Sequence, residues 1–161
     1  MVRYVNEKLG VPFGFCYPVK TNNRAYSLGY NLSEDYFSYK NLESSLKTLL
    51  SLKRMGYAIA NLGTYIEDTI RFHENKYPNF CCKGGEDVIY IDWSGNVYPC
   101  FVKEKLFSIL NGEEARFLKG VECNDCLTNC FREPSILSKL PFSPLLIKEV
   151  LYSHSVRALF I

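Results

Sequence analysis

Apolar residues recur at helical intervals in two places in the first part of the chain. Residues 1–9 have helical spacing and precede Gly10, which falls where a left-handed C-terminal cap is expected, so they are predicted to be the end of a helix. A leucine stripe over residues 41–55 predicts a second helix, which Gly56 would end.

Two short, almost wholly apolar segments lie between these helical patterns and are predicted to be strands, over residues 11–19 and 57–60. Thr64 and Glu67 then fit a capping box that begins a third helix, which should stop before Pro78. Alternating helices and strands are the order that builds a parallel sheet through crossover connections. The first part of the chain therefore predicts an α/β architecture.

The second half follows a different pattern. Residues 88–92 and 97–101 alternate in polarity about a turn at 93–96, where Gly and Asn tolerate positive φ, so an antiparallel hairpin is predicted. Elsewhere we expect a loop, a partly helical segment and a terminal helix, over residues 21–38, 103–119 and 145–160 respectively.

These elements predict three regions. Residues 1–79 are expected to form the C-terminal portion, about half, of a partial parallel β/α barrel, because the chain opens on the end of a helix without the strand that should precede it. Residues 80–135 are expected to form a small cysteine-rich domain made of the β-hairpin plus a helix, and residues 136–161 a C-terminal helical segment.

Composition and charge narrow the class of protein. The 161 residues are 47% hydrophobic and 15% aromatic, which is typical of a folded globule. The net charge is +2 and no run of Lys or Arg forms a stripe, so nucleic acid is not expected as a partner. The sequence has neither a signal-peptide pattern nor an apolar run of membrane-spanning length, which predicts a cytoplasmic protein without a membrane partner.

Five cysteines in the second half carry the candidate chemistry: Cys82, Cys100, Cys123, Cys126 and Cys130. The hairpin can return Cys100 to the neighbourhood of Cys82, and the last three form a Cys-x-x-Cys-x-x-x-Cys cluster. An odd total of seven cysteines favours metal ligands or buried thiols over disulfides in a reducing compartment. Thiols gathered in this way can hold tetrahedral zinc or an iron–sulfur cluster.

The order Cys82, twelve residues, Gly95, four residues, Cys100 resembles the opening half of the SPASM motif of radical SAM enzymes, and Cys123-x-x-Cys126 resembles its second half. A full SPASM domain usually carries seven cysteines and two auxiliary clusters. The shorter pattern here looks more like a twitch domain, which binds one auxiliary 4Fe-4S cluster. The resemblance implies that Cys82, Cys100, Cys123 and Cys126 are the ligands.

Two cysteines are left open by this resemblance. Cys130 is a spare thiol or an alternative fourth ligand. Cys81 and Cys82 cannot face the same way from an extended backbone, and the spacing to Gly95 favours Cys82.

The Cys-x-x-x-Cys-x-x-Cys loop that binds the catalytic cluster of radical SAM enzymes is absent. Radical cleavage is therefore not expected of this chain alone, and S-adenosylmethionine would be a cofactor only if a missing N-terminal part were supplied. The resemblance implies an auxiliary cluster that serves electron transfer or organises a substrate site. It also implies an N-terminal radical SAM half or an electron donor as partner, and a peptide or small-molecule substrate.

Two alternatives stay open. The same four thiolates suit a structural zinc site, and cysteines can also be buried hydrophobic residues of an interaction or scaffold domain. Lys83, Lys103 and Arg132 lie near the candidate ligands and could offset the negative charge of a cluster, although ordinary solvated side chains are the simpler interpretation.

Overall fold

The structure is a computed structural model that describes residues 1–17, 39–139, 144 and 147. The chain divides into two compact units, of which unit 1 comprises residues 1–16, 33–79 and 139–161, and unit 2 comprises residues 17–32 and 80–138. The predicted loop over 21–38 and, apart from Ile147, the predicted terminal helix over 145–160 lie outside the described residues.

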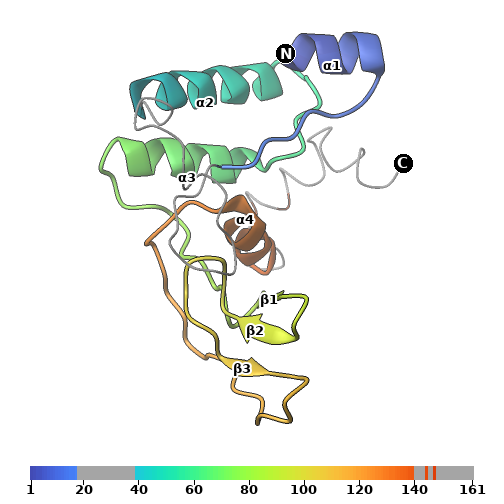
Figure 1. Cartoon of the computed structure of the whole chain (residues 1–161). Coiled ribbons are helices and arrows are strands. Elements are labelled where there is room, and N and C mark those ends of the chain that lie inside the picture. Colours follow the sequence, from blue (N-terminus) through green and yellow to red (C-terminus); the bar gives the residue numbers. More distant parts are fainter. Residues whose placement is uncertain (18–38, 140–143, 145–146, 148–161) are drawn as a thin grey trace. The chain divides into compact units, whose positions relative to one another are not determined.

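Unit 1 contains three of the helices in Figure 1: α1 (Val2–Leu9), α2 (Tyr39–Arg54) and α3 (Gly63–His73). The predicted helices over 1–9 and 41–55 are confirmed as α1 and α2. Gly10 caps α1 in the left-handed conformation, at φ 67°. Helix α2 packs against α3, and the core of this unit gathers one apolar stripe from each.

The two predicted strands of unit 1 meet in parallel at a single bridge between Phe13 and Ile59. The amide of Phe13 donates to Ala58 and that of Ala60 donates to Phe13, both at 2.8 Å. The side chain of Asn61 extends this pairing, because its amide group both accepts from the Phe15 N–H at 2.9 Å and donates to the Phe15 carbonyl at 3.0 Å. Within the described part of unit 1 this is the only strand pairing, so a barrel remains a prediction.

The predicted capping box at Thr64 is wrong. Helix α3 begins at Gly63, with Leu62 at the N-cap position and no side-chain cap hydrogen bond. Because Gly63 is the first helical residue, Thr64 lies inside the first turn and is not at the N-cap position. The end of α3 at His73, before Pro78, agrees with the prediction.

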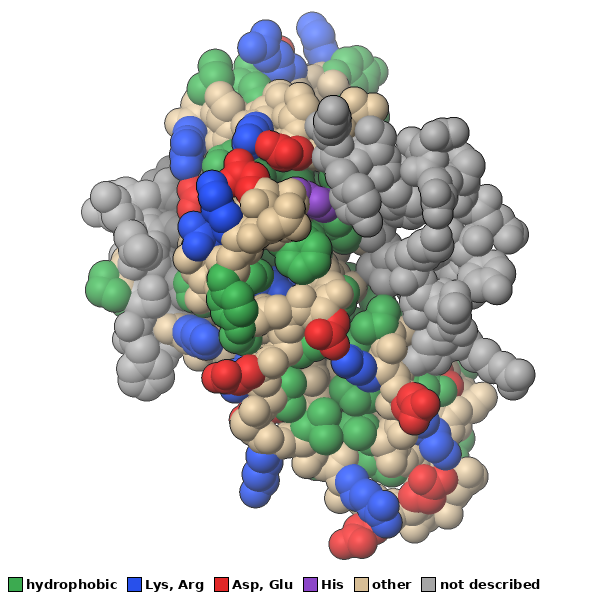
Figure 2. Space-filling view, turned by 90° about the vertical axis from the view of Figure 1, so that its left-hand side faces the viewer, with side chains coloured by type: hydrophobic (Ala, Val, Ile, Leu, Met, Phe, Trp, Pro, Cys, Tyr) green, Lys and Arg blue, Asp and Glu red, His purple; other side chains and the backbone are tan. Residues whose placement is uncertain are grey.

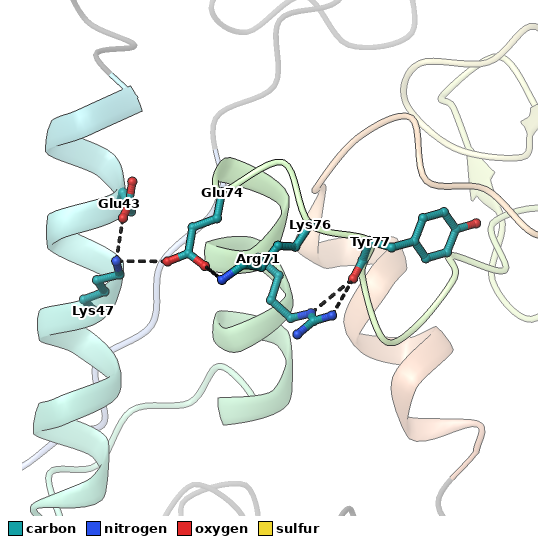
Figure 3. Close-up of polar contacts among 6 residues, drawn as sticks. All are labelled: Glu43, Lys47, Arg71, Glu74, Lys76 and Tyr77. Atoms are coloured by element: carbon teal, nitrogen blue, oxygen red, sulfur yellow. Dashed lines mark hydrogen bonds and ion pairs between the residues drawn. The ribbon is translucent and has the colours of Figure 1, made fainter.

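Exposed polar contacts link the C-terminal end of α3 to α2 and to the residues that follow α3, as Figure 3 shows. Lys47 of α2 contacts Glu43 at 2.5 Å and Glu74 at 3.1 Å, and Glu74 also pairs with Lys76 at 2.6 Å. Arg71 donates twice to the carbonyl of Tyr77, at 3.1 and 3.0 Å. Solvated pairs of this kind contribute little stability but fix the direction of the chain that leaves the helix.

Unit 2 is built on a three-stranded antiparallel sheet of β1 (Tyr90–Ile91), β2 (Asn96–Tyr98) and β3 (Phe107–Ser108), in the order β1-β2-β3. The predicted hairpin is confirmed, with Tyr90 opposite Tyr98. Its turn is closed by Asp92, whose carboxylate accepts from the backbone amides of Ser94 and Asn96, both at 2.9 Å.

The helical segment predicted over 103–119 is wrong, because it contains β3 and turns. The second edge of β2 captures this part of the chain: the amide of Leu106 donates to Val97 at 2.7 Å, and Phe107 pairs with Val97. Phe107 is buried against the sheet, whereas Leu110 is exposed. The apolar residues whose spacing resembles that of a helix therefore belong to a short strand and a turn.

Helix α4 (Asn129–Leu137) was not anticipated. Pro134 lies inside it, and proline ordinarily signals the end of a helix. Burial stabilises α4 nonetheless, because Phe131, Arg132, Ser135 and Ile136 all lie in the interior. No helix in the described residues has the length and apolar character needed to cross a bilayer.

Candidate metal centre

Four of the five cysteines singled out above line one cavity of about 440 Å³ in unit 2. Cys82 precedes the hairpin, Cys100 follows β2, and Cys123 and Cys126 come from the segment before α4. Three separate stretches of chain therefore bring thiols to the same hollow.

Cys82 and Cys123 are joined through their backbones. They form an isolated antiparallel bridge in which the Cys82 amide donates to Cys123 at 2.8 Å and the Cys123 amide donates to Cys82 at 3.1 Å. Directly opposed residues of such a pair present their side chains on the same face. Cys81 projects to the other face of this stretch and accepts a hydrogen bond from Asn124 Nδ2 at 3.3 Å.

Gly84 lets Cys100 approach this pair closely. A Cβ at position 84 would lie 3.0 Å from the Pro99 carbonyl oxygen and 3.5 Å from both Cys82 Sγ and Cys100 Cβ. The chain that follows Cys82 thus passes directly beside Cys100, and a Cβ at this position would crowd the Pro99 carbonyl oxygen while making ordinary contact with the two cysteines.

Backbone amides point at three of the four sulfurs. The N–H of Gly84 donates to Cys82, that of Val102 to Cys100, and that of Asp125 to Cys123, so in each case the donor lies two residues after the cysteine. The amide of Lys103 also donates to Cys100. Such donors stabilise a thiolate and orient it toward a metal, and they tune the potential of a bound cluster.

Burial and the backbone amides shift the pKa of the thiols in opposite directions. Burial is the largest cause that raises the pKa of the Cys82 and Cys100 thiols above the usual value, and the neighbouring Cys126 and Cys123 raise both further. The pKa of Cys123 is raised for the same first reason, while Lys103 acts to lower it. Thiols in this state hold their protons at neutral pH, so binding of a metal would release protons.

The walls of the cavity are largely apolar. Cys82 and Cys100 are only 6% and 8% exposed and pack against Phe131, which is 3% exposed. The ring of Phe131 meets Phe101 edge to face at 4.9 Å, and Phe101 meets Tyr90 at 5.0 Å in the same way. The remaining apolar lining comes from Pro99, Leu106, Leu118 and Val121. A site lined in this way has a low local dielectric, which strengthens electrostatic interactions inside it.

The two lysines named as neighbours of the ligands both pair with carboxylates. Lys103 lines the cavity and pairs with Asp125 at 2.5 Å, whereas Lys83 pairs with Glu86 at 3.5 Å. Arg132 is buried, so the simpler expectation of a solvated arginine is wrong. Its burial follows from its position on the inner face of α4, a helix that the sequence did not reveal. On the face drawn in Figure 2, charged side chains of both signs are interspersed.

The structure does not bring Cys130 to the other thiols. Cys130 lies on α4, is exposed and is not part of the cavity lining. Cys126 lies in the lining, and its sulfur is 3.4 Å from the Thr128 hydroxyl.

In the part of the chain that the structure describes, no three His, Cys, Asp or Glu side chains are gathered closely enough to hold a metal ion. The four thiols share the walls of one cavity without closing on a single point. Their chemistry nevertheless fits a thiophilic metal or cluster: four sulfurs, three of them approached by amides, in an apolar hollow.

Sequence reasoning missed Phe131 and Ser135 of α4, and it placed Arg132 near the ligands without its burial. Their shared signal is an i, i+1, i+4 spacing after Thr128, which lies at the N-cap position of α4, and Pro134 obscured it. No protein-family model, curated protein or solved structure matches the chain.

Proposed function

We propose that unit 2 binds one iron–sulfur cluster of the 4Fe-4S type through Cys82, Cys100, Cys123 and Cys126. The observation that carries this proposal is the common cavity, which is lined by four thiols from three chain segments. The spacing of Cys82, Gly95 and Cys100, which resembles a twitch-type domain, favours a cluster over a single ion.

When bound, a cluster of this kind supplies one-electron redox chemistry. The chain's own contribution is to exclude water and to hold charge. Phe131 packs against Cys82 and Cys100, leucines line the rest of the cavity, and the amides of Gly84, Val102 and Asp125 donate to the sulfurs. Ligation by four thiolates leaves no open position for substrate, so electron transfer or organisation of a neighbouring site is the role that fits.

On a larger scale, we infer that the chain is the C-terminal portion of a radical SAM/SPASM-type protein. The parallel bridge between Phe13 and Ile59 supports this inference, because the later strands of a partial barrel would pair in this way. The partner would then be an N-terminal radical SAM half or an electron donor, and the substrate a peptide or small molecule. The chain alone would not cleave S-adenosylmethionine, since it lacks the three-cysteine loop.

A structural zinc site is the second candidate. The amides that donate to Cys82, Cys100 and Cys123 would suit zinc-bound thiolates equally well. Zinc would stabilise unit 2 and supply no electron transfer.

Metal and sulfide analysis of the anaerobically purified full chain tests the proposal. Iron and acid-labile sulfide in comparable amounts, with visible absorption that bleaches on reduction, are expected. Zinc without iron or sulfide would overturn the cluster and support the second candidate. A protein that takes up neither, even after reconstitution with iron and sulfide, would indicate that the cysteines are simply buried residues.

Single Cys→Ser variants locate the ligands. Replacing Cys82, Cys100, Cys123 or Cys126 is expected to lower metal affinity by more than the roughly 10–100-fold that loss of an outer-shell partner causes. Cys81→Ser and Cys130→Ser are matched controls, because one thiol faces Asn124 and the other is exposed. A Cys130 variant that lost iron while the Cys126 variant kept it would move the fourth ligand to Cys130.

A further inference from the structure

Arg132 is the largest fully buried side chain in the described residues, with 1% of its surface exposed. An arginine keeps its positive charge in proteins, and a charge is buried only where polar groups or opposite charges compensate it. The surroundings of Arg132 therefore indicate what its charge serves.

The guanidinium of Arg132 donates to three acceptors that lie beside the proposed ligands. One is the carbonyl of Phe80, two residues before Cys82. The others are Asn124 Oδ1 at 3.3 Å and the carbonyl of Cys126 at 3.4 Å. One side chain thus joins the segment that carries Cys82 to the segment that carries Cys123 and Cys126.

Helix α4 carries Arg132 together with two residues that contact the thiol site. Phe131, the preceding residue, lines the cavity itself. Ser135, four residues after Phe131 on the same helix, accepts from the Lys83 amide at 2.8 Å and hydrogen bonds to the Cys82 thiol. The buried face of α4 therefore supports the thiols from behind, and Arg132 is its charged member.

We propose that Arg132 is the positioning and charge-compensating residue of the thiolate site, which holds the Cys123–Cys126 segment in place and raises the reduction potential of the bound cluster. This inference rests on the cluster proposed above. Four thiolates make the bound cluster anionic, and reduction adds another negative charge. A fixed positive charge in a low-dielectric environment stabilises the reduced form more than the oxidised form, so it raises the potential.

The test compares variants of the full chain after anaerobic reconstitution, by iron and sulfide content and by the midpoint potential from a spectroscopic redox titration. Arg132→Gln removes the charge, and Arg132→Lys keeps the charge but not the planar fork. Asn124→Asp leaves the guanidinium in place and adds a carboxylate to it. Arg116→Gln, at an exposed position of the same unit, is the matched control.

Arg132→Gln is expected to hold less iron and, in the loaded fraction, to show about a tenfold higher ratio of oxidised to reduced cluster at a fixed potential, a shift of about 59 mV downward for a one-electron couple. Asn124→Asp should retain the iron and shift the potential in the same direction. Arg132→Lys should lose iron while its loaded fraction keeps a potential near that of the wild type, and Arg116→Gln should match the wild type in both measurements.

Each contrary outcome has a distinct meaning. A wild-type chain that binds no cluster overturns the proposed function and this inference with it. A loaded wild type whose potential and iron content are shared by Arg132→Gln and Asn124→Asp overturns the inference alone. If Arg132→Gln fails to fold, the midpoint potential of Asn124→Asp tests the inference instead. A potential equal to that of the wild type would show that Arg132 serves packing only and would overturn its role in charge compensation.

Discussion

Glu86 ties the chain that follows Cys82 to the chain that precedes Cys123. Its carboxylate accepts from the Val121 amide at 2.8 Å and lies 3.5 Å from Lys83 Nζ. These contacts lower the pKa of Glu86, first through the amides of Val121 and Gly120 and then through Lys83. The ionised form is therefore the one that the folded state prefers.

Linkage then gives a pH dependence. Because the folded pKa of Glu86 lies below the usual 4.5, its contribution to stability is fully present above that value and is lost as pH falls through the folded pKa. Glu86→Gln should lower the stability of unit 2 at neutral pH and flatten its decline under acid, measured by urea unfolding between about pH 3 and 7. Glu114→Gln, at an exposed position, is the control; a Glu86→Gln curve parallel to the wild-type curve would contradict the prediction.

At the scale of elements, α4 stabilises the cavity through Phe131. Its ring packs against Cys82 and Cys100 and meets Phe101 edge to face. Phe131→Ala should reduce the stability of unit 2 by roughly 3–5 kcal/mol, because it removes a buried aromatic ring and leaves a cavity.

Labelling of Cys82 and Cys100 measures this loss, since both thiols are buried until unit 2 opens. The variant should react faster with a thiol reagent in denaturant than the wild type does. Leu137→Ala, at a position 37% exposed on the same helix, should change the rate far less. Equal rates for the two variants would show that Phe131 is not essential to the packing.

Elements with strong local signals could be predicted from the sequence, and those formed by tertiary contacts could not. The leucine stripe of α2, the cap at Gly10 and the hairpin closed by Asp92 each depend on a few neighbouring residues. Strand β3 is different, because Phe107 extends only where β2 offers a free edge. Helix α4 likewise forms around Pro134 because its other residues are buried.

The candidate site, too, has features that could be predicted from the sequence and features that depend on tertiary contacts. Cysteine spacing singled out five thiols, and four of them, the set that the resemblance implies, line the cavity. It could not reveal that Ser135 lies behind them or that Arg132 is buried there, since both depend on the packing of α4. Nor could it show the amide of Gly84 beside Cys82, because that contact depends on how the backbone turns.

At the scale of the whole molecule, each unit has a core of its own. The buried apolar residues of α2 and α3 belong to unit 1, and the proposed ligands all belong to unit 2.

A group that binds only the folded form of unit 2 stabilises that unit by mass action. Loading the chain with a cluster should therefore slow amide hydrogen exchange in residues 80–138 and leave residues 41–79 nearly unchanged. Equal slowing in both ranges would show that the units do not respond separately.

The backbone bridge between Cys82 and Cys123 has a consequence for the kinetics of loading. Two residues that are 41 positions apart are held opposite each other by two hydrogen bonds, so closure of the intervening loop comes from folding and does not await a metal. If the proposed cluster is assembled here, an iron ion captured by one of these thiols would meet the other at a high effective concentration, and the second bond would form intramolecularly. The first two attachments would then be fast and paired.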